Sequence, residues 1–333
     1  MAVIRDMMPA FELFRPVSVD DALGLMARHG EGAWALAGGL DTFDWLKDRV
    51  KRPEAVIDLG AISEMRGISA DGGGLTVGAM TTLTEVTTSP MVMSDFSVLS
   101  EAASHVATPQ IRNQGTLGGN IAQDTRCWYY RGGWPCYRAG GNICYAAAPK
   151  AMNREHCIIG ASRCVAVNPS DTAPALIALD AEMVIRSERA ERVVAAEDFF
   201  MSPAVDITRM TVLEPNELLT EIRIPATWAG ARFYFEKVRD RQSWDFSLVT
   251  VASAMRMDGT TVQDARIVVN GVAPHPVRVT EAERIVIGSE AGEAVGEAAG
   301  EAGIRRAKPL RHNDFKLPLM RNLIRRAIRG QEG

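Results

Sequence analysis

Residues 35–42 read Ala-Leu-Ala-Gly-Gly-Leu-Asp-Thr, and residues 116–120 read Thr-Leu-Gly-Gly-Asn. The first Gly-Gly pair lies between an apolar strand expected at 34–37 and a helix expected from about 41 to 47, and the second lies at a similar junction. Glycine permits positive φ angles and lets backbone N–H groups come close to an anion. A single Gly-Gly pair is usually only a turn, and neither has the G-x-G-x-x-G spacing of a Rossmann domain. Two facing turns, however, could hold the two phosphates of a dinucleotide.

The sequence around these turns predicts a mixed α/β first part up to about residue 225 and an α+β second part beyond it. In the first part we expect helices at 18–30, 96–106 and 170–179, with Ser18 as the cap of the first helix, and strands at 55–59, 75–79, 164–167 and 183–187. In the second part we expect strands at 232–238, 247–257 and 265–272, a helix at 280–287 and a weak surface helix within 290–303. The basic tail from Ile304 is expected to form an amphipathic helix that docks on its own domain, with arginines on the solvated face.

Length, composition and charge exclude several classes of protein. The chain has 333 residues, of which 47% are apolar and 23% charged, so two or three globular domains are expected rather than a disordered or fibrous protein. A net charge of −4 does not suggest a nucleic-acid partner. The sequence contains no run of 18 apolar residues, so no membrane-spanning helix is expected. The first nine residues lack a signal-peptide pattern, so we expect a cytoplasmic location by default, with a periplasmic one open if a signal-bearing partner exports the chain.

All five cysteines lie between residues 127 and 164. An odd number in a chain of this kind argues against a disulfide framework. The stretch 125–165 also holds six Lys or Arg against one Glu, and four of the five tyrosines. Because the gaps contain no C-x-x-C pair, a zinc site would be unusual. Four thiolates from one long loop favour a cubane iron–sulfur cluster, with a zinc site and inert buried thiols as alternatives.

Few other residues suggest chemistry. Lys237 lies among aromatic residues on a predicted strand and is a candidate to reach a cofactor ring, although such a lysine is more often solvated. The five histidines show no metal-ligand spacing and are interpreted as structural. No nucleophile elbow, Walker loop or H-E-x-x-H motif is present, and no catalytic acid–base pair is identified.

Taken in order, these motifs resemble the FAD-binding (medium) subunit of the xanthine dehydrogenase family of molybdenum hydroxylases, over nearly the whole chain. The motifs that carry the resemblance are 37–41 (Ala-Gly-Gly-Leu-Asp), 116–120, Ser170-Asp171, 217–225, 235–237 (Phe-Glu-Lys) and 270–274 (Asn-Gly-Val-Ala-Pro). The resemblance implies an α+β fold in which a two-part PCMH-type FAD-binding domain precedes a CO-dehydrogenase-flavoprotein-like α+β domain. The expected ranges are 1–225 for the first domain, with lobes 1–60 and 61–225 and an iron–sulfur loop at 123–166, and 226–333 for the second.

The resemblance also implies the cofactor-binding residues. Residues 35–42 and 116–120 would hold the FAD pyrophosphate, Asp171 would lie on the ribose side, and Leu219 and Lys237 would lie near the isoalloxazine. The full set is Ala35, Leu36, Ala37, Gly38, Gly39, Leu40, Asp41, Thr42, Thr116, Gly118, Gly119, Asn120, Asp171, Leu219 and Lys237. The implied ligands of a [4Fe-4S] cluster are Cys127, Cys136, Cys144 and Cys164, which leaves Cys157 free. Leu40 departs from the family, which usually has Thr there.

The implied function is electron transfer in a complex. The partners would be a large subunit with the molybdenum cofactor, where the substrate binds, and a small [2Fe-2S] subunit. The cysteine loop is similar to that of bacterial aldehyde oxidoreductase flavin subunits and of the β subunit of 4-hydroxybenzoyl-CoA reductase, and residues 153–156 (Asn-Arg-Glu-His) favour the former. A zinc- or redox-sensing binding protein is the alternative of another class, and a self-sufficient flavoprotein oxidase is a third.

Overall fold

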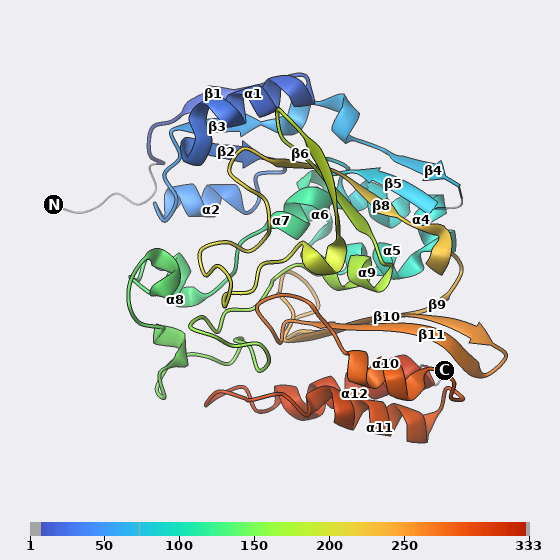
Figure 1. Cartoon of the computed structure of the whole chain (residues 1–333). Helices are drawn as coiled ribbons and strands as arrows, with labels where there is room; N and C mark the ends of the chain where they lie inside the picture. The colour runs from blue at the N-terminus through green and yellow to red at the C-terminus, as the bar shows by residue number, and fades with distance from the viewer. Residues whose placement is uncertain (1–7, 73, 331–333) are drawn as a thin grey trace.

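The computed structural model describes residues 8–72 and 74–330. Within these residues the chain forms three β-sheets, with helices packed between and below them (Figure 1). The N-terminal residues on which the signal-peptide expectation rests lie mostly outside the described part. Across the described residues, every helix is too short or too polar to cross a lipid bilayer.

The first sheet is small and parallel, with the strand order β1-β3-β2. Its elements are β1 (Glu12–Phe14), α1 (Val19–His29), β2 (Ala33–Leu36), α2 (Thr42–Lys47) and β3 (Ala55–Asp58). The side chain of Ser18 caps α1 by accepting a hydrogen bond from the backbone N–H of Asp21, as the sequence predicts. The first Gly-Gly turn therefore leaves the carboxyl end of β2, the edge at which ligands usually bind in parallel α/β sheets.

The second sheet is antiparallel, with the strand order β4-β5-β8-β6-β7. Its strands are β4 (Ile68–Asp71), β5 (Gly74–Gly78), β6 (Glu182–Arg186), β7 (Glu191–Ala195) and β8 (Leu218–Ile224). The helices between β5 and β6 are α3 (Leu83–Thr88), α4 (Pro90–Asp95), α5 (Ser97–Ser104), α6 (Pro109–Gln114), α7 (Leu117–Ala122), α8 (Trp128–Arg131) and α9 (Ala173–Ala178). All of these helices except α6 and α8 contribute buried side chains to one large apolar core that also includes the sheet. The last strand in sequence, β8, lies at the centre and joins two hairpins.

The third sheet is also antiparallel, with the order β12-β11-β10-β9, and it has apolar partners on both faces. Its elements and those that follow are β9 (Arg232–Val238), β10 (Val249–Asp258), β11 (Thr261–Asn270), β12 (Val277–Arg278), α10 (Thr280–Val286), α11 (Glu293–Ile304) and α12 (Lys316–Arg329). Successive residues of β10 point to opposite faces. Ala252 and Ala254 join the first core, whereas Val251 and Met255 pack in the core that includes α10, α11 and α12.

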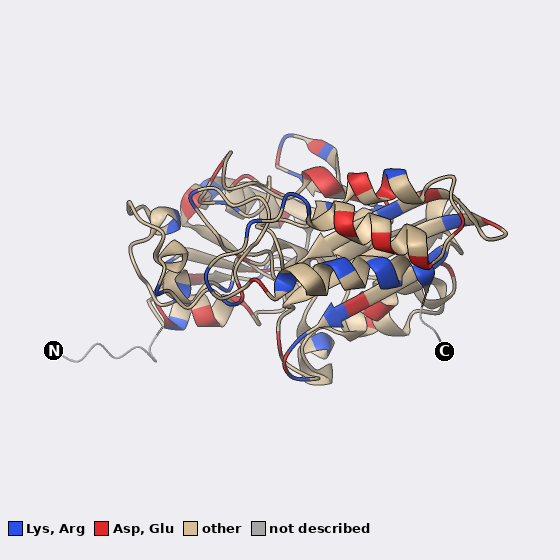
Figure 2. Cartoon of the chain, turned by 90° about the horizontal axis from the view of Figure 1, so that it is seen from below, with Lys and Arg blue, Asp and Glu red and all other residues tan. Residues whose placement is uncertain are grey.

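Helices α11 and α12 correct one expectation and refine another. The tract at 290–303 was expected to be a weak surface helix, but its small residues Gly296, Ala299 and Gly300 are buried because α12 packs closely against them. Helix α12 docks on its own domain, as predicted. Its arginines, however, form ion pairs with acidic residues of α11, among them Arg321 with Glu301 at 2.9 Å (Figure 2).

Residues 164–167 were predicted to be a strand, and that prediction is wrong. Their polar backbone groups pair with irregular segments: the carbonyl of Val165 accepts from the N–H of Cys157, and that of Val167 accepts from the hydroxyl of Thr125. No neighbouring strand is therefore available among the described residues. The helix expected from Ser170 begins only at Ala173, because the hydroxyl of Ser170 accepts a hydrogen bond from the N–H of Ala173.

The cysteine-containing insertion, residues 123–166, has little regular structure apart from α8 and two 3₁₀ turns, Tyr137–Ala139 and Tyr145–Ala147. It extends from the remainder of the chain beside α8 (Figure 1). Near its end, the insertion is hydrogen-bonded to the segment that follows β11 and to the segment that precedes α12. The N–H of Ile158 donates to the carbonyl of Val272, and the N–H of Lys308 donates to the carbonyl of Ile158.

Candidate functional site

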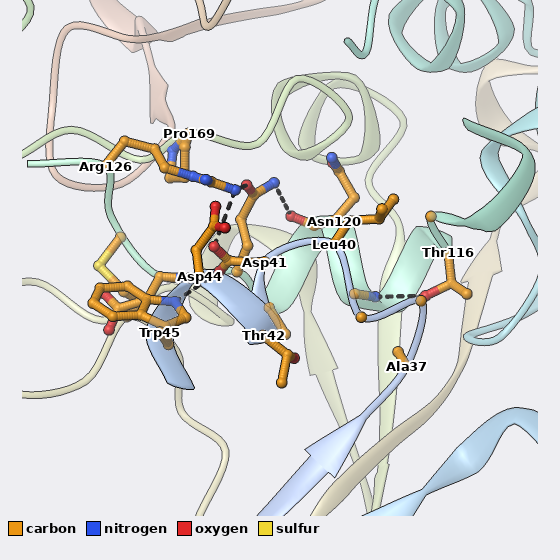
Figure 3. Close-up of a pocket in the computed structure, with 18 of the residues that line it drawn as sticks. Ala37, Leu40, Asp41, Thr42, Asp44, Trp45, Thr116, Asn120, Arg126 and Pro169 are labelled. Carbon is orange, nitrogen blue, oxygen red and sulfur yellow. Dashed lines mark hydrogen bonds and ion pairs between the residues drawn. The ribbon is translucent and has the colours of Figure 1, made fainter. Parts of the chain in front are cut away.

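The two Gly-Gly turns face each other at one pocket of about 440 Å³ (Figure 3). A Cβ atom on Gly119 would lie 3.4 Å from the Cβ of Ala37, which belongs to the opposite turn. A Cβ atom on Gly38 would lie 2.3 Å from the carbonyl oxygen of Gln114, at the end of α6. Glycine is therefore needed where the two turns approach each other.

Most of the residues expected to bind FAD line this pocket. They are Ala35, Ala37, Gly38, Gly39, Leu40, Asp41, Thr42, Thr116, Gly119, Asn120 and Asp171. Four others are not part of its lining: Leu36, Gly118, Leu219 and Lys237. Leu219 lies on β8 opposite Ile185 and is 7% exposed in the main core. Lys237 lies behind Asp171 and contacts it directly.

The turns differ in the hydrogen-bond donors that they offer. Within residues 8–72 and 74–330, the backbone N–H groups of residues 38–41 have no acceptor, so the first turn can bind an anion. In the second turn the N–H of Gly118 donates to the carbonyl of Ala79 at 2.8 Å, and that of Gly119 donates to Oγ1 of Thr116 at 3.0 Å. The second turn thus contributes shape more than free donors.

Asp41 connects the first turn to the cysteine-containing insertion. Its carboxylate forms an ion pair with Arg126 at 3.0 Å and accepts a hydrogen bond from Nε1 of Trp45 at 3.2 Å (Figure 3). It also forms an ion pair with Arg131 at 2.5 Å. The guanidinium of Arg131 also lies 3.7 Å from the ring centroid of Trp45. These contacts direct the Asp41 carboxylate toward the insertion, so this residue holds the turn and the insertion together.

Asp171 and Lys237 form a buried ion pair beside the pocket. The Nζ atom of Lys237 lies 2.6 Å from Oδ2 of Asp171 and also donates to the carbonyl of His105 at 3.1 Å. Burial raises the pKa of Asp171, and Lys237 and Arg239 oppose that rise. The other oxygen, Oδ1, is buried without a hydrogen-bond partner in the described part of the chain. A ribose hydroxyl is a donor that could satisfy it, so this group fits a nucleotide ligand.

A second polar network fixes the segment that carries Asp171. Oδ1 of Asn120, in the second turn, accepts hydrogen bonds from the hydroxyls of Ser170 and Thr172, both at 2.7 Å. Nδ2 of Asn270 donates to the carbonyl of Ser170 at 2.7 Å. These bonds connect the second turn, the segment before α9 and the end of β11 around one side of the pocket.

The five cysteines are free thiols, and several of them lie close enough to influence the pKa of another. Cys136 and Cys157 are buried, and the other three are half-buried. Burial raises the pKa of Cys127 to about 11, and the neighbouring Cys164 and Cys144 add to the rise. Burial also raises the pKa of Cys164, whose neighbours Cys144 and Cys136 act in the same direction. If these thiols bound a metal cluster as thiolates, their negative charges would need positive charge nearby.

A buried arginine lies beside the thiols. Arg138 is 6% exposed, lowers the pKa of Cys164, and has a buried Nε without a partner among the described groups. Between residues 8 and 330, as far as they are described, no three His, Cys, Asp or Glu side chains converge closely enough for a single metal ion. A cubane does not need that convergence, because each thiolate binds a different iron atom.

One histidine that was interpreted as structural from the sequence, His156, lies beside a cysteine of the insertion. Nε2 of His156 is 3.3 Å from Sγ of Cys127, and the ring is 3% exposed. Burial and the nearby ammonium of Lys316 lower the pKa of His156 to about 4. The contact joins residues 29 positions apart, and no metal-ligand spacing in the sequence could have indicated it.

Sequence reasoning also missed Arg126 and Phe246, which line both the main pocket and a second cavity of about 230 Å³. The guanidinium of Arg126 stacks on Phe246, 4.5 Å from its ring centroid. The second cavity also has Cys127 and His156 in its wall. For Arg126 the only available signal was the excess of arginine in the insertion, which does not identify individual residues, and no sequence signal indicated Phe246.

Comparison with known proteins identifies the family. Residues 9–227 match a family model described as the FAD binding domain in molybdopterin dehydrogenase, and residues 233–330 match the CO dehydrogenase flavoprotein C-terminal domain. The chain belongs to the FAD-binding medium subunits of the molybdenum hydroxylase family. This confirms the α+β fold with a FAD-binding domain and a CO-dehydrogenase-flavoprotein-type C-terminal domain, and it makes the chain an oxidoreductase subunit.

Relatives of this medium subunit align over nearly their whole length. The aldehyde oxidoreductase FAD-binding subunit PaoB of Escherichia coli K12 is 34% identical, over 95% of this chain and 96% of that protein. The carbon monoxide dehydrogenase medium chain of Hydrogenophaga pseudoflava is 31% identical, over 96% of each. A solved carbon monoxide dehydrogenase from that organism superposes with a TM-score of 0.77, and it covers 96% of both chains at 31% identity. Quinoline 2-oxidoreductase from Pseudomonas putida 86 gives 0.75 at 26% identity, over 97% of this chain and 96% of that one.

In this medium subunit, Gly119→Val is expected to weaken FAD binding. The added methyl groups would fill the space between the two turns, next to Ala37. An overpacked contact costs about 1–3 kcal/mol, so the affinity should fall about tenfold, measured by flavin titration of the flavin-free protein. The matched control is Gly24→Val in α1, where a Cβ meets nothing within 4 Å. Equal flavin affinity in both variants would contradict the assignment of the pocket.

Proposed function

We propose that this subunit binds one FAD and one [4Fe-4S] cluster and transfers electrons from a molybdenum centre on another subunit. FAD would occupy the pocket between the two turns, and the cluster would be held by Cys127, Cys136, Cys144 and Cys164. One observation carries the proposal: Arg126 lines the flavin pocket, and the next residue, Cys127, belongs to the group of thiols. The two proposed cofactor sites would therefore be adjacent in the fold.

The residues in the pocket suit this role. The free N–H groups of residues 38–41 would bind the pyrophosphate, and Asp171 would accept a hydrogen bond from the ribose. FAD would be bound non-covalently. Bound flavin can take up single electrons from clusters and pass on a pair. Lys237, because its ammonium is engaged by Asp171, would act on the cofactor through that carboxylate, and Leu219 would support the site from the core.

We also propose a division of the chain into two domains. We place the FAD-binding domain at 1–225 and the C-terminal domain at 226–333, with lobes 1–60 and 61–225 in the first. The two family models, which match 9–227 and 233–330, support a boundary in this region. The third sheet contributes to both apolar cores, so the two domains are expected to unfold together.

The partners would be a large subunit with the molybdenum cofactor and a small [2Fe-2S] subunit. The names of the relatives, a FAD-binding subunit and medium chains, support a multi-subunit complex. The substrate would bind to the large subunit and would be an aldehyde or an aromatic compound. The aldehyde branch is favoured by the motif at 153–156 and by the relative from Escherichia coli. In the alternative, a 4-hydroxybenzoyl-CoA reductase-like complex, electrons would flow toward molybdenum.

Purification of the complex without oxygen tests the proposal. We expect an absorption spectrum with flavin bands and a broad iron–sulfur shoulder, one FAD and about four irons per chain, and two further subunit types by mass spectrometry. A colourless protein that contains zinc would favour the sensor alternative instead. A stable and fully active enzyme that consists of this chain alone would overturn the proposed partners.

A further inference from the structure

We propose that His156 is a positioning residue for the iron–sulfur cluster, and that it donates a hydrogen bond from Nε2–H to Sγ of Cys127 and favours the reduced state. This inference rests on the proposed function, because it needs the cluster on Cys127. Among the described residues, no other histidine side chain forms a hydrogen bond with a cysteine side chain.

The surroundings of the imidazole assign its proton. Nδ1 of His156 is buried and has no partner in the described part of the chain, whereas Nε2 lies 3.3 Å from the sulfur of Cys127. A neutral imidazole carries one N–H. Because the sulfur of a ligating cysteine can only accept, a proton on Nδ1 alone would leave that N–H buried without an acceptor and would leave no donor between Nε2 and Sγ. The favourable tautomer therefore has its proton on Nε2, directed at Cys127.

Residues before and within α12 hold His156 in place. The carbonyl of His156 accepts hydrogen bonds from Nδ2 of Asn313 at 2.9 Å and from Nζ of Lys316 at 3.1 Å. Lys316 also donates to the carbonyl of Gly271 at 2.7 Å. Asn313 and Lys316 are both 0% exposed. The backbone of His156 is thus fixed between the third sheet and α12, so its ring has little freedom to leave Cys127.

The effect of this hydrogen bond on the redox state follows from the charge of the cluster. Reduction adds one electron to the cluster, breaks no bond to Cys127, and leaves the proton on His156. The reduced cluster is the more negative state, and a donor to a ligand sulfur stabilises it more than the oxidised state. Cys127 lines the smaller cavity, which shares Arg126 with the flavin pocket. The hydrogen bond would therefore act on the cluster ligand that lies toward the flavin.

Two substitutions separate donation from packing. His156→Phe keeps a ring but removes the donor, whereas His156→Gln keeps a side-chain N–H. We expect His156→Phe to retain its iron and to shift the cluster midpoint to a more negative potential in an anaerobic redox titration followed by electron paramagnetic resonance. A tenfold change in the ratio of reduced to oxidised cluster corresponds to about 59 mV for one electron. His156→Gln should stay closer to the parent, and the flavin midpoint, titrated in the same samples, should not move.

Each outcome of these measurements either supports or contradicts the proposed role of His156. Loss of iron in His156→Phe but not in His156→Gln would also support donation to the ligand. Parent-like midpoints in both variants at full iron content, or loss of iron from both, would overturn the role of His156 while leaving the proposed function intact. A parent protein without iron would instead overturn the cluster assignment itself, together with this inference.

Discussion

Replacing Cys164 with alanine is expected to remove or degrade the cluster, whereas replacing Cys157 with alanine should leave about four irons per chain. Cys164 is half-buried, and Cys144, Cys136 and Arg138 lie close enough to its thiol to shift its pKa. Cys157 is 1% exposed, and burial raises its pKa to about 12. We interpret Cys157 as a packed thiol and Cys164 as the ligand. Iron and labile-sulfide analysis of the two variants, purified without oxygen, measures the difference.

Cys157 serves as the matched control because it receives the same substitution within the same group of thiols. Cys164 and Cys144 lie close enough to Cys157 to raise its pKa, so Cys157 is the natural substitute ligand. Iron loss from Cys157→Ala together with retention in Cys164→Ala would exchange their roles. Equal iron in both variants would mean that either thiol can complete the site.

Local sequence patterns predicted much of the fold. Glycine pairs, apolar alternation and a capping serine located β2, α1 and the long strands β9 and β10 because these signals act over a few residues. The strand expected at 164–167 failed for the same reason. Its apolar residues resemble a strand, but their partners are Cys157 and Thr125, in irregular segments. A strand needs a neighbouring strand, and local composition does not show whether one is present.

The candidate site was predictable only in outline. The Gly-Gly turns and the cysteines are motifs that can be read in the sequence, and the structure brings each group together. The contacts that join the two groups are distant in sequence: Asp41 meets Arg131 across 90 positions. An aspartate in a turn and an arginine in the insertion carry no signal that they pair. The same holds for His156 and Cys127, where the fold, rather than spacing, makes the contact.

The buried pair near the flavin pocket leads to the second large effect: Lys237→Met is expected to destabilise the protein by about 3–5 kcal/mol. The substitution leaves the Asp171 carboxylate, whose side chain is 4% exposed, without its ammonium partner at 2.6 Å. The double variant Lys237→Met/Asp171→Asn should recover most of this loss, because no unpaired charge remains buried. Arg154→Met is the matched exposed control and should cost at most about 1 kcal/mol, since the Arg154–Asp240 pair lies at the surface. Urea denaturation of all variants in the same cofactor state measures these differences.

The deficit of Lys237→Met should depend on pH with a defined sign. Burial raises the pKa of Asp171 and Lys237 opposes the rise, so removing the ammonium should raise this pKa further above its ordinary value of 3.8. A carboxyl group with a raised pKa in the folded state favours folding at low pH and loses that contribution as the pH rises through the folded-state pKa. The deficit against the parent should therefore shrink on acidification, beginning well above pH 3.8. The double variant, which has no carboxyl group at 171, should show no such recovery. A deficit that is constant from neutral to acidic pH would mean that Asp171 is not left charged and unpaired, and the buried ion pair would lose its assigned role.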